Sequence, residues 1–243
     1  MVRDMLLDVI KHSNVNDIDN IKLETTEDKT KIYAMDESSS IILSGKLNNA
    51  ITEKSTNFAI SQLNILKGFA LLKNFASDNA EVKITNTNNP DNDPTEITFK
   101  DEKNQSASFR LTDPKLLPKQ LQFKGVSWDV EITPENNKVD EFEKFSNVLS
   151  SYEDYFIVKT ENDNLIFSIG EKNHKSFVIF SENVDGNKIL GNMKWQTKKV
   201  LSILKLVKNK ENAKIRFSNK GAMEIELKSD YGVYTYTMPG TKV

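Results

Sequence analysis

Lysines at helical spacing are the residues of this sequence best suited to chemistry. Lys198 and Lys205 are two helical turns apart with Ser202 between them, so a helix would place these residues on one face. No Asp or Glu occurs between Gly186 and Lys210. Such a row of ammonium groups suits sequence-independent contact with phosphates. Because no aromatic residue lies between Lys198 and Lys205, contact with a duplex backbone is expected rather than stacking on single-stranded bases.

A second basic helix is expected in the first half of the chain. There, Lys67 and Asn64 would lie opposite an apolar side made of Leu66, Phe69 and Leu72. Two interpretations of these basic faces remain open. One is a solvated surface in a chain whose composition favours lysine over arginine, and the other is a wall that faces phosphate. The net charge of −2 does not decide between them, because only the distribution of charge bears on partners.

The residues that most enzyme chemistries need are missing from the sequence. It contains no cysteine, which excludes disulfides and thiolate sites and is typical of a cytoplasmic protein. His12 and His174 stand far apart in polar contexts, so both are expected to be solvated surface residues. No phosphate-binding glycine loop or nucleophile-elbow motif occurs. The sequence therefore predicts a protein that is not an enzyme and that uses no cofactor or metal.

The first residues of the chain favour a short amphipathic helix over a targeting signal. Asp4 and Asp8 interrupt the apolar stretch of residues 1–12, which a signal core would not tolerate. No apolar segment approaches the length of a membrane span. A cytoplasmic location and the lack of a membrane partner are therefore expected.

Periodicity and turn residues predict an alternation of helices and strands. The expected helices are residues 2–12, 61–75, 137–152 and 197–209. The helix at 137–152 would bury one face made of Phe142, Phe145, Leu149 and Tyr152. The expected strands are residues 21–26, 30–35, 40–47, 80–86, 95–100, 105–111, 127–133, 155–160, 164–169, 175–182, 213–218, 222–228 and 232–238.

The two halves of the chain resemble each other. Residues 58–85 and 193–218 both read as an apolar helix that ends in Lys-Asn, then a polar loop, then an alternating strand. The sequence therefore predicts an α+β fold of two similar domains, each with two helices packed on antiparallel sheet. The expected boundaries are residues 1–112 and 126–243, with a proline-containing connector at 113–125.

Three segments carry a resemblance to a known family. They are AMDESSSIIL at 34–43, the stretch from SASFRLTDPKLLPKQ to SNVLSS at 106–151, and YGVYTYTMPG at 231–240. In this order they resemble DNA polymerase sliding clamps, most closely the T-even-like tailed-bacteriophage branch. The resemblance implies the DNA-clamp fold and a homotrimeric ring, with helices around the hole. It also implies a processivity factor that encircles double-stranded DNA, binds a DNA polymerase and needs an ATP-dependent clamp loader, in the host cytoplasm.

The resemblance and helical phase together give a set of expected DNA-facing lysines. The family's basic positions match Lys11, Lys67, Lys144 and Lys205. Helical phase adds Lys73, Lys138, Lys194, Lys198, Lys199 and Lys208. The helix at 137–152 departs from the family pattern, because Asn147 stands at an often basic site. This helix also carries the acids Asp140, Glu141 and Glu143. Its face is therefore expected to be less positive.

The resemblance also implies two protein-binding surfaces. A pocket for a partner peptide matches Met35, Ser40, Leu116, Leu117, Tyr236, Met238 and Pro239. Alternatively, Leu116 and Leu117 only pin the connector to the body. Subunits would join through strand edges at Ser106, Ser108, Phe109, Leu111, Ser176, Phe177, Ile179 and Ser181.

Two rival interpretations make different predictions. A structural virion protein built of duplicated α+β domains would show no dependence on DNA and no basic helical face. An enzyme with an unrecognised site would show turnover and a cleft that gathers acids or histidines.

Overall fold

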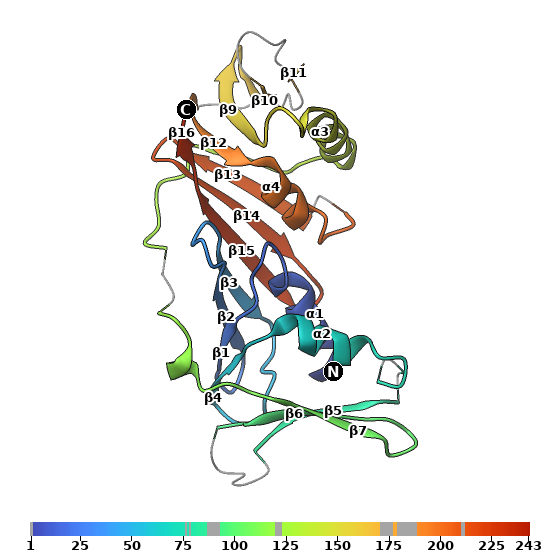
Figure 1. Cartoon of the computed structure of the whole chain (residues 1–243). Helices are drawn as coiled ribbons and strands as arrows, with labels where there is room; N and C mark the ends of the chain where they lie inside the picture. The colour runs from blue at the N-terminus through green and yellow to red at the C-terminus, as the bar shows by residue number, and fades with distance from the viewer. Residues whose placement is uncertain are drawn as a thin grey trace. The chain divides into compact units, whose positions relative to one another are not determined.

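A computed structural model describes residues 2–75, 77, 79–86, 93–119, 123–170, 177–178, 189–209 and 212–243 (Figure 1). The chain divides into two compact units. Unit 1 comprises Met1–Gln122 with Ser229–Tyr234, and unit 2 comprises Phe123–Lys228 with Thr235–Val243. The domain boundaries at 112 and 126 stay a prediction. No helix in the described part of the chain is long and apolar enough to cross a membrane.

Unit 1 combines two helices with antiparallel strands. Its sheets have the orders β4-β1-β2-β3 and β5-β6-β7, and α1 contacts both α2 and β5. The elements are α1 (Val2–Ser13), β1 (Ile21–Thr25), β2 (Thr30–Met35), β3 (Ile42–Leu47), β4 (Thr56–Ile60), α2 (Leu63–Leu71), β5 (Glu81–Thr85), β6 (Glu96–Lys100), β7 (Ser106–Arg110) and the 3-10 helix η1 (Pro114–Leu116).

Unit 2 has the same construction. Its strands form the orders β11-β10-β9-β12-β16 and β15-β14-β13-β8, and α3 contacts α4. The elements are β8 (Val130–Ile132), α3 (Asn136–Leu149), β9 (Tyr155–Glu161), β10 (Asn164–Ile169), β11 (Phe177–Val178), β12 (Leu190–Gln196), α4 (Thr197–Leu204), β13 (Ala213–Ser218), β14 (Ala222–Lys228), β15 (Gly232–Pro239) and β16 (Thr241–Lys242).

The predicted repeat of helix, strands, helix and strands is present in both halves, but three strands were missed: β4, β12 and the two-residue β16. β4 leads into α2, and β12 leads into α4. The end of β4 is buried at three successive residues, and β12 carries a register shift between Leu190 and Lys194. Neither segment therefore shows the alternation that identifies a strand in sequence. Of the strand expected at 175–182, the structure describes only β11.

α2, α3 and α4 end earlier than predicted, and two residues expected in the core are exposed. α2 ends at Leu71, and Leu72 has an extended backbone that removes its side chain from the helical phase, so it is 50% exposed. α3 ends at Leu149, and Tyr152 beyond it is 88% exposed. The predicted burial of Leu72 and Tyr152 is therefore wrong. Phe142, by contrast, is buried as predicted.

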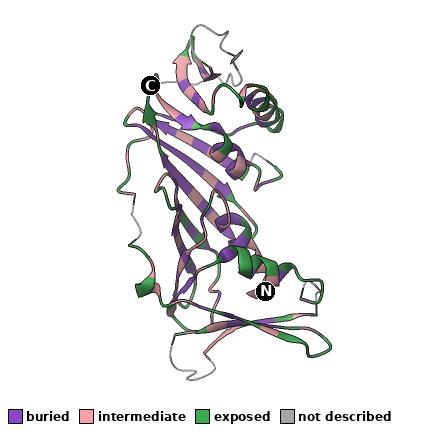
Figure 2. Ribbon diagram, in the orientation of Figure 1, coloured by how far each residue is buried: buried purple, intermediate pink, exposed green. Residues whose placement is uncertain are grey.

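An aromatic cluster forms the core of unit 2, in which β13 and β14 are buried along most of their length (Figure 2). Phe142 of α3 packs edge-on against Phe156 of β9 at 5.1 Å between ring centroids, and Phe156 stacks on Phe167 of β10 at 5.4 Å. Phe167 and Trp195 each contact Phe217 of β13 at 5.6 Å. The cluster thus joins α3, both sheets of unit 2 and the strand that precedes α4.

Replacing Phe156 with Ala should destabilise the protein by about 3 to 5 kcal/mol, because the ring is fully buried and in contact with three other rings. Chemical denaturation followed by circular dichroism measures the loss as a lower midpoint. Tyr152→Ala is the matched control, and its effect should stay within about 0.5 kcal/mol because Tyr152 is exposed. Equal effects of the two changes would contradict the packing described.

A buried polar cluster fixes α1 within unit 1. Asp8 Oδ2 accepts hydrogen bonds from Ser229 Oγ and Tyr234 Oη, both at 2.8 Å. His12 Nδ1 donates to the Asp8 carbonyl oxygen at 2.9 Å, and its ring stacks on Tyr234 at 4.2 Å. His12 is only 1% exposed, so its predicted place on a solvated surface is wrong. The error arises because Tyr234 lies more than 200 residues away in sequence. His174 lies outside the described residues.

The segment of Ser229–Tyr234 is held closely against β3. Asn48 donates its backbone N–H to the Tyr231 carbonyl oxygen at 2.8 Å. A Cβ atom at Gly232 would clash with the carbonyl oxygen of Lys46, so this approach requires glycine. Burial alone would raise the pKa of Asp8. Hydrogen bonds from His12, Tyr234 and Ser229, with the charge of His12, outweigh burial and lower this pKa below 3.8.

The lowered pKa of Asp8 makes unit 1 sensitive to acid. The stabilisation from ionised Asp8 is fully present above pH 3.8 and is lost as the pH falls through the lower pKa of the folded state. Asp8→Asn should lower the free energy of unfolding at neutral pH by about 1 to 3 kcal/mol. The free energy of unfolding of this variant should also depend less on pH in the acid range. Denaturation midpoints measured across the acid range test this, with the exposed Asp140→Asn as control. An unchanged acid dependence in Asp8→Asn would refute the assignment.

Candidate nucleic-acid interface

Helix α4 presents lysines opposite a buried apolar side. Val200 and Leu204 are each 1% exposed, and Val207 beyond the helix is 6% exposed, as predicted. Lys198 extends into solvent with 78% exposure, whereas Lys199 is half-buried. The predicted helix at 197–209 stops at Leu204, where Lys205 caps it. A cation at this end is favoured by the partial negative charge of the helix terminus.

Lys138, Lys198 and Lys205, three of the predicted lysines of unit 2, form ion pairs with acids in the part of the chain that the structure describes. Lys205 Nζ lies 2.6 Å from Glu143 Oε1, which links α4 to α3. Lys198 Nζ lies 3.5 Å from Asp154 Oδ1, and the Asp154 carbonyl oxygen also accepts the first N–H of α4, that of Thr197. The third pair, between Lys138 and Glu141 at 3.6 Å, lies within α3. Exposed pairs of this kind are weak, so the lysines remain exchangeable with another anion.

The remaining lysines of unit 2 lie on different elements. Lys144 is exposed on α3, as is Asn147. Lys194, on β12, places its Nζ 4.8 Å from the centre of the Tyr155 ring, which is a cation–π contact. Lys208 is exposed in the bend after α4.

In unit 1 the basic residues surround the contact between α1 and α2. Lys67 is exposed on α2 and donates to Asn14 Oδ1 at 3.3 Å. Asn14 in turn donates to Asn64 Oδ1 at 3.1 Å, so one polar side chain beyond α1 binds two positions of α2. Lys11 is exposed in the last turn of α1, and Lys73 is exposed in the turn after α2.

Sequence reasoning missed Asn14 and Asp154 as partners of the lysines. Both lie far from the lysines in sequence and outside the helices, so helical phase carried no signal for them. The acids of α3 were identified as a source of negative charge, but the specific pairing of Glu143 with Lys205 depends on the packing of α3 and α4.

The residues of the predicted partner-peptide pocket are divided between the two units. Met35 ends β2, and Ser40 Oγ donates to the buried carboxylate of Asp36 at 2.6 Å. Leu116 is 77% exposed and Leu117 is half-buried. Within β15, Tyr236 and Met238 are buried, while Pro239 is exposed. The pocket stays a prediction.

The structure describes some of the residues predicted to join subunits through strand edges. β7 ends the order β5-β6-β7 and carries Ser106, Ser108 and Phe109, with Leu111 directly after it. Ser108 Oγ donates to Glu96, and Phe109 and Leu111 are buried. β11 ends the order β11-β10-β9-β12-β16 and contains Phe177. Ser176, Ile179 and Ser181 lie outside the described residues.

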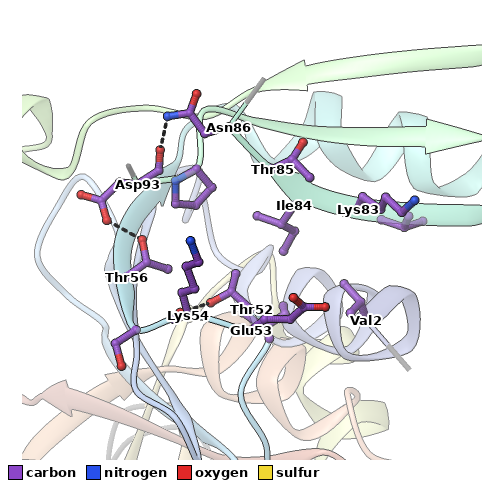
Figure 3. Close-up of a pocket in the computed structure, with 14 residues that line it drawn as sticks. Val2, Thr52, Glu53, Lys54, Thr56, Lys83, Ile84, Thr85, Asn86 and Asp93 are labelled. Atoms are coloured by element: carbon purple, nitrogen blue, oxygen red, sulfur yellow. Dashed lines mark hydrogen bonds between the residues drawn. The ribbon is translucent and has the colours of Figure 1, made fainter. Parts of the chain in front are cut away.

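A separate groove of about 490 Å³ lies within unit 1 (Figure 3). It is lined by residues 51–56, by 82–86 on and after β5, and by Val2, Asp93 and Pro94. Asp93 Oδ1 accepts a hydrogen bond from Thr56 Oγ1 at 2.5 Å on one wall. The residues predicted to bind a partner peptide or DNA do not line this groove.

Two helices and antiparallel sheets in each of two repeated units define the DNA-clamp fold, an α+β architecture, as the sequence predicts. Solved clamps of the PCNA type share it. The chain matches PCNA from A. fulgidus, bound to the C-terminal region of FEN-1, with a TM-score of 0.72 and 10% identity over 98% of this chain and 95% of that one. It matches PCNA from Thermococcus kodakaraensis with a TM-score of 0.71 and 12% identity, over 99% and 97% of the chains.

A third match is the PCNA2–PCNA3 complex from Sulfolobus tokodaii, with a TM-score of 0.65 and 12% identity over 98% of this chain and 96% of that one. No family model and no curated protein matches the sequence. At these identities the likeness is one of fold, and it extends over nearly the whole chain.

Replacing Lys198 and Lys205 together with Glu should weaken binding to a short DNA duplex without unfolding the protein. If both lysines contact phosphates, the slope of log affinity against log salt should become shallower by about two. Fluorescence anisotropy at several salt concentrations measures this slope. Stability should fall by at most about 2 kcal/mol, because both side chains are more than half exposed.

Lys220→Glu serves as the control for that experiment, since Lys220 is an exposed lysine of the same unit in the turn between β13 and β14. Its salt slope should match that of the unmodified protein. Unchanged DNA binding in the double variant, together with lost stability, would show that this face of α4 is not the interface.

Proposed function

We propose that this chain is a sliding clamp, a processivity factor that encircles duplex DNA and tethers a replicative DNA polymerase. The clamp fold over 98% to 99% of the chain, combined with exposed lysines on α2 and α4, carries the proposal. A closed ring holds DNA by topology, so each phosphate contact can be weak while the clamp stays on the duplex. Lysine contacts without base recognition permit sliding because every phosphate is equivalent.

The proposed ring is a homotrimer, in which three copies supply six domains with the boundaries 1–112 and 126–243. β7 and β11 each stand at the end of a sheet, and an unpaired edge is a site for strand pairing. Pairing β7 of one subunit with β11 of the next is a head-to-tail contact that closes into a ring. The S. tokodaii complex of PCNA2 with PCNA3 supports contact between clamp subunits in this fold.

Partners would bind as peptides at Met35, Ser40, the connector leucines and the end of β15. The A. fulgidus structure, in which PCNA is bound to the C-terminal region of FEN-1, supports peptide binding by this fold. Tethering raises the effective concentration of a polymerase at the primer end. We further propose an ATP-dependent loader as the ring opener and, from the resemblance of the quoted segments, a place in the T-even-like phage branch with action in the host cytoplasm.

One experiment tests the proposal directly. Mass in solution should correspond to three copies, and the protein should remain on nicked circular DNA after incubation with a clamp loader and ATP. Linearising the circle should release it, because a ring can slide off an end. A monomer that ignores DNA, or equal retention on circular and linear DNA, would refute the clamp assignment.

A further inference from the structure

Glu143 and Lys205 form an ion pair that joins α3 to the end of α4 in unit 2. Lys205 Nζ lies 2.6 Å from Glu143 Oε1, with Glu143 near the middle of α3 and Lys205 at the end of α4. The side chains are 34% and 53% exposed, so the pair is open to water and ions. A carboxylate oxygen at this distance makes a charge-assisted hydrogen bond of the same kind as a phosphate oxygen would.

Two other ion pairs formed by the predicted DNA-facing lysines of unit 2 have longer distances between their charged atoms. Lys198 and Asp154 are separated by 3.5 Å and are 78% and 60% exposed, while Lys138 and Glu141 are separated by 3.6 Å. Among these pairs Glu143 therefore competes most strongly for its lysine. Binding of Lys205 to DNA requires exchange of the Glu143 carboxylate for a phosphate. The loss of the ion pair lowers the net free energy gained when Lys205 binds DNA.

We propose that Glu143 is a built-in competitor for DNA phosphate, which holds Lys205 and keeps the contact of α4 with the duplex weak. This inference rests on the proposed clamp function and adds a residue that limits affinity. Weak contact suits a ring, since topology supplies the residence time and a tightly bound lysine would slow sliding. Glu143 thus acts on DNA through Lys205 and touches no DNA itself.

The test compares Glu143→Gln with Glu135→Gln. Both changes remove one negative charge of the same kind near α3, but Glu135 precedes the helix and its side chain makes no capping hydrogen bond. Binding to a short duplex at low salt should strengthen about two- to fivefold in Glu143→Gln. The slope of log affinity against log salt should steepen by up to about 0.9, the value for one added phosphate contact. Glu135→Gln should show a smaller gain and an unchanged slope.

A double-mutant cycle shows whether Lys205 mediates the effect. In a Lys205→Gln background, Glu143→Gln should no longer strengthen binding beyond the gain of Glu135→Gln. Equal gains from Glu143→Gln and Glu135→Gln, or a gain that persists without Lys205, would overturn the inference while leaving the clamp intact. If the unmodified protein and every variant fail to bind DNA at any salt concentration, both the inference and the proposed function fail. Circular dichroism confirms that each variant is folded.

Discussion

The burial of one apolar side of each helix is the constraint on which the charged surface depends. Phe142 fixes the rotation of α3 about its axis, because its ring packs edge-on against Phe156 and Phe167. With that rotation set, the neighbouring Glu143 reaches Lys205, and Lys144 is left in solvent. A core of rigid rings permits few alternative rotations, since any other would expose Phe142 or overpack the cluster. The positions of the charges are therefore a consequence of packing rather than of attraction between them.

The ion pairs of Lys138, Lys198 and Lys205 are weak, and weak ion pairs suit the proposed function. Exposed ion pairs contribute about 0 to 1 kcal/mol, so they do not hold the fold together and they oppose exchange with a phosphate only by this small amount. Unit 2 also contains a stronger network on its sheet, in which Arg216 contacts Glu131 and Glu224 at 2.6 Å. Arg216 and Lys214 lower the pKa of Glu131, the hydrogen bond from Lys214 most of all. Arg216 is thus held by several acids, whereas Lys138, Lys198 and Lys205 each form an ion pair with one acid.

The sequence was sufficient for the α+β class, the duplicated order of elements and the buried side of α4, because these follow from local periodicity. It was insufficient where distant residues decide the outcome. His12 is buried because Tyr234 stacks on it, and Asp154 lies beside Lys198 because its carbonyl oxygen accepts the first N–H of α4. Periodicity also failed at helix ends, where Tyr152 and Leu72 leave the helical phase. The peptide pocket came from resemblance, the DNA-facing lysines came from resemblance and helical phase together, and the roles of both stay predictions.

The two units share an architecture but differ in what their lysines contact. In unit 1, Lys67 is bound by the neutral amide of Asn14 at 3.3 Å, whereas in unit 2 Lys205 is bound by the carboxylate of Glu143 at 2.6 Å. A neutral acceptor leaves the ammonium charge uncompensated, while a carboxylate cancels most of it at a distance. If the lysines of both units contact the same duplex, each must leave its present partner to reach a phosphate. Lys67 then breaks a weaker hydrogen bond than Lys205 does. The two units thus share one architecture, but an amide contacts the lysine in unit 1 and an acid contacts it in unit 2, which makes the two units unequal in their attraction for polyanions.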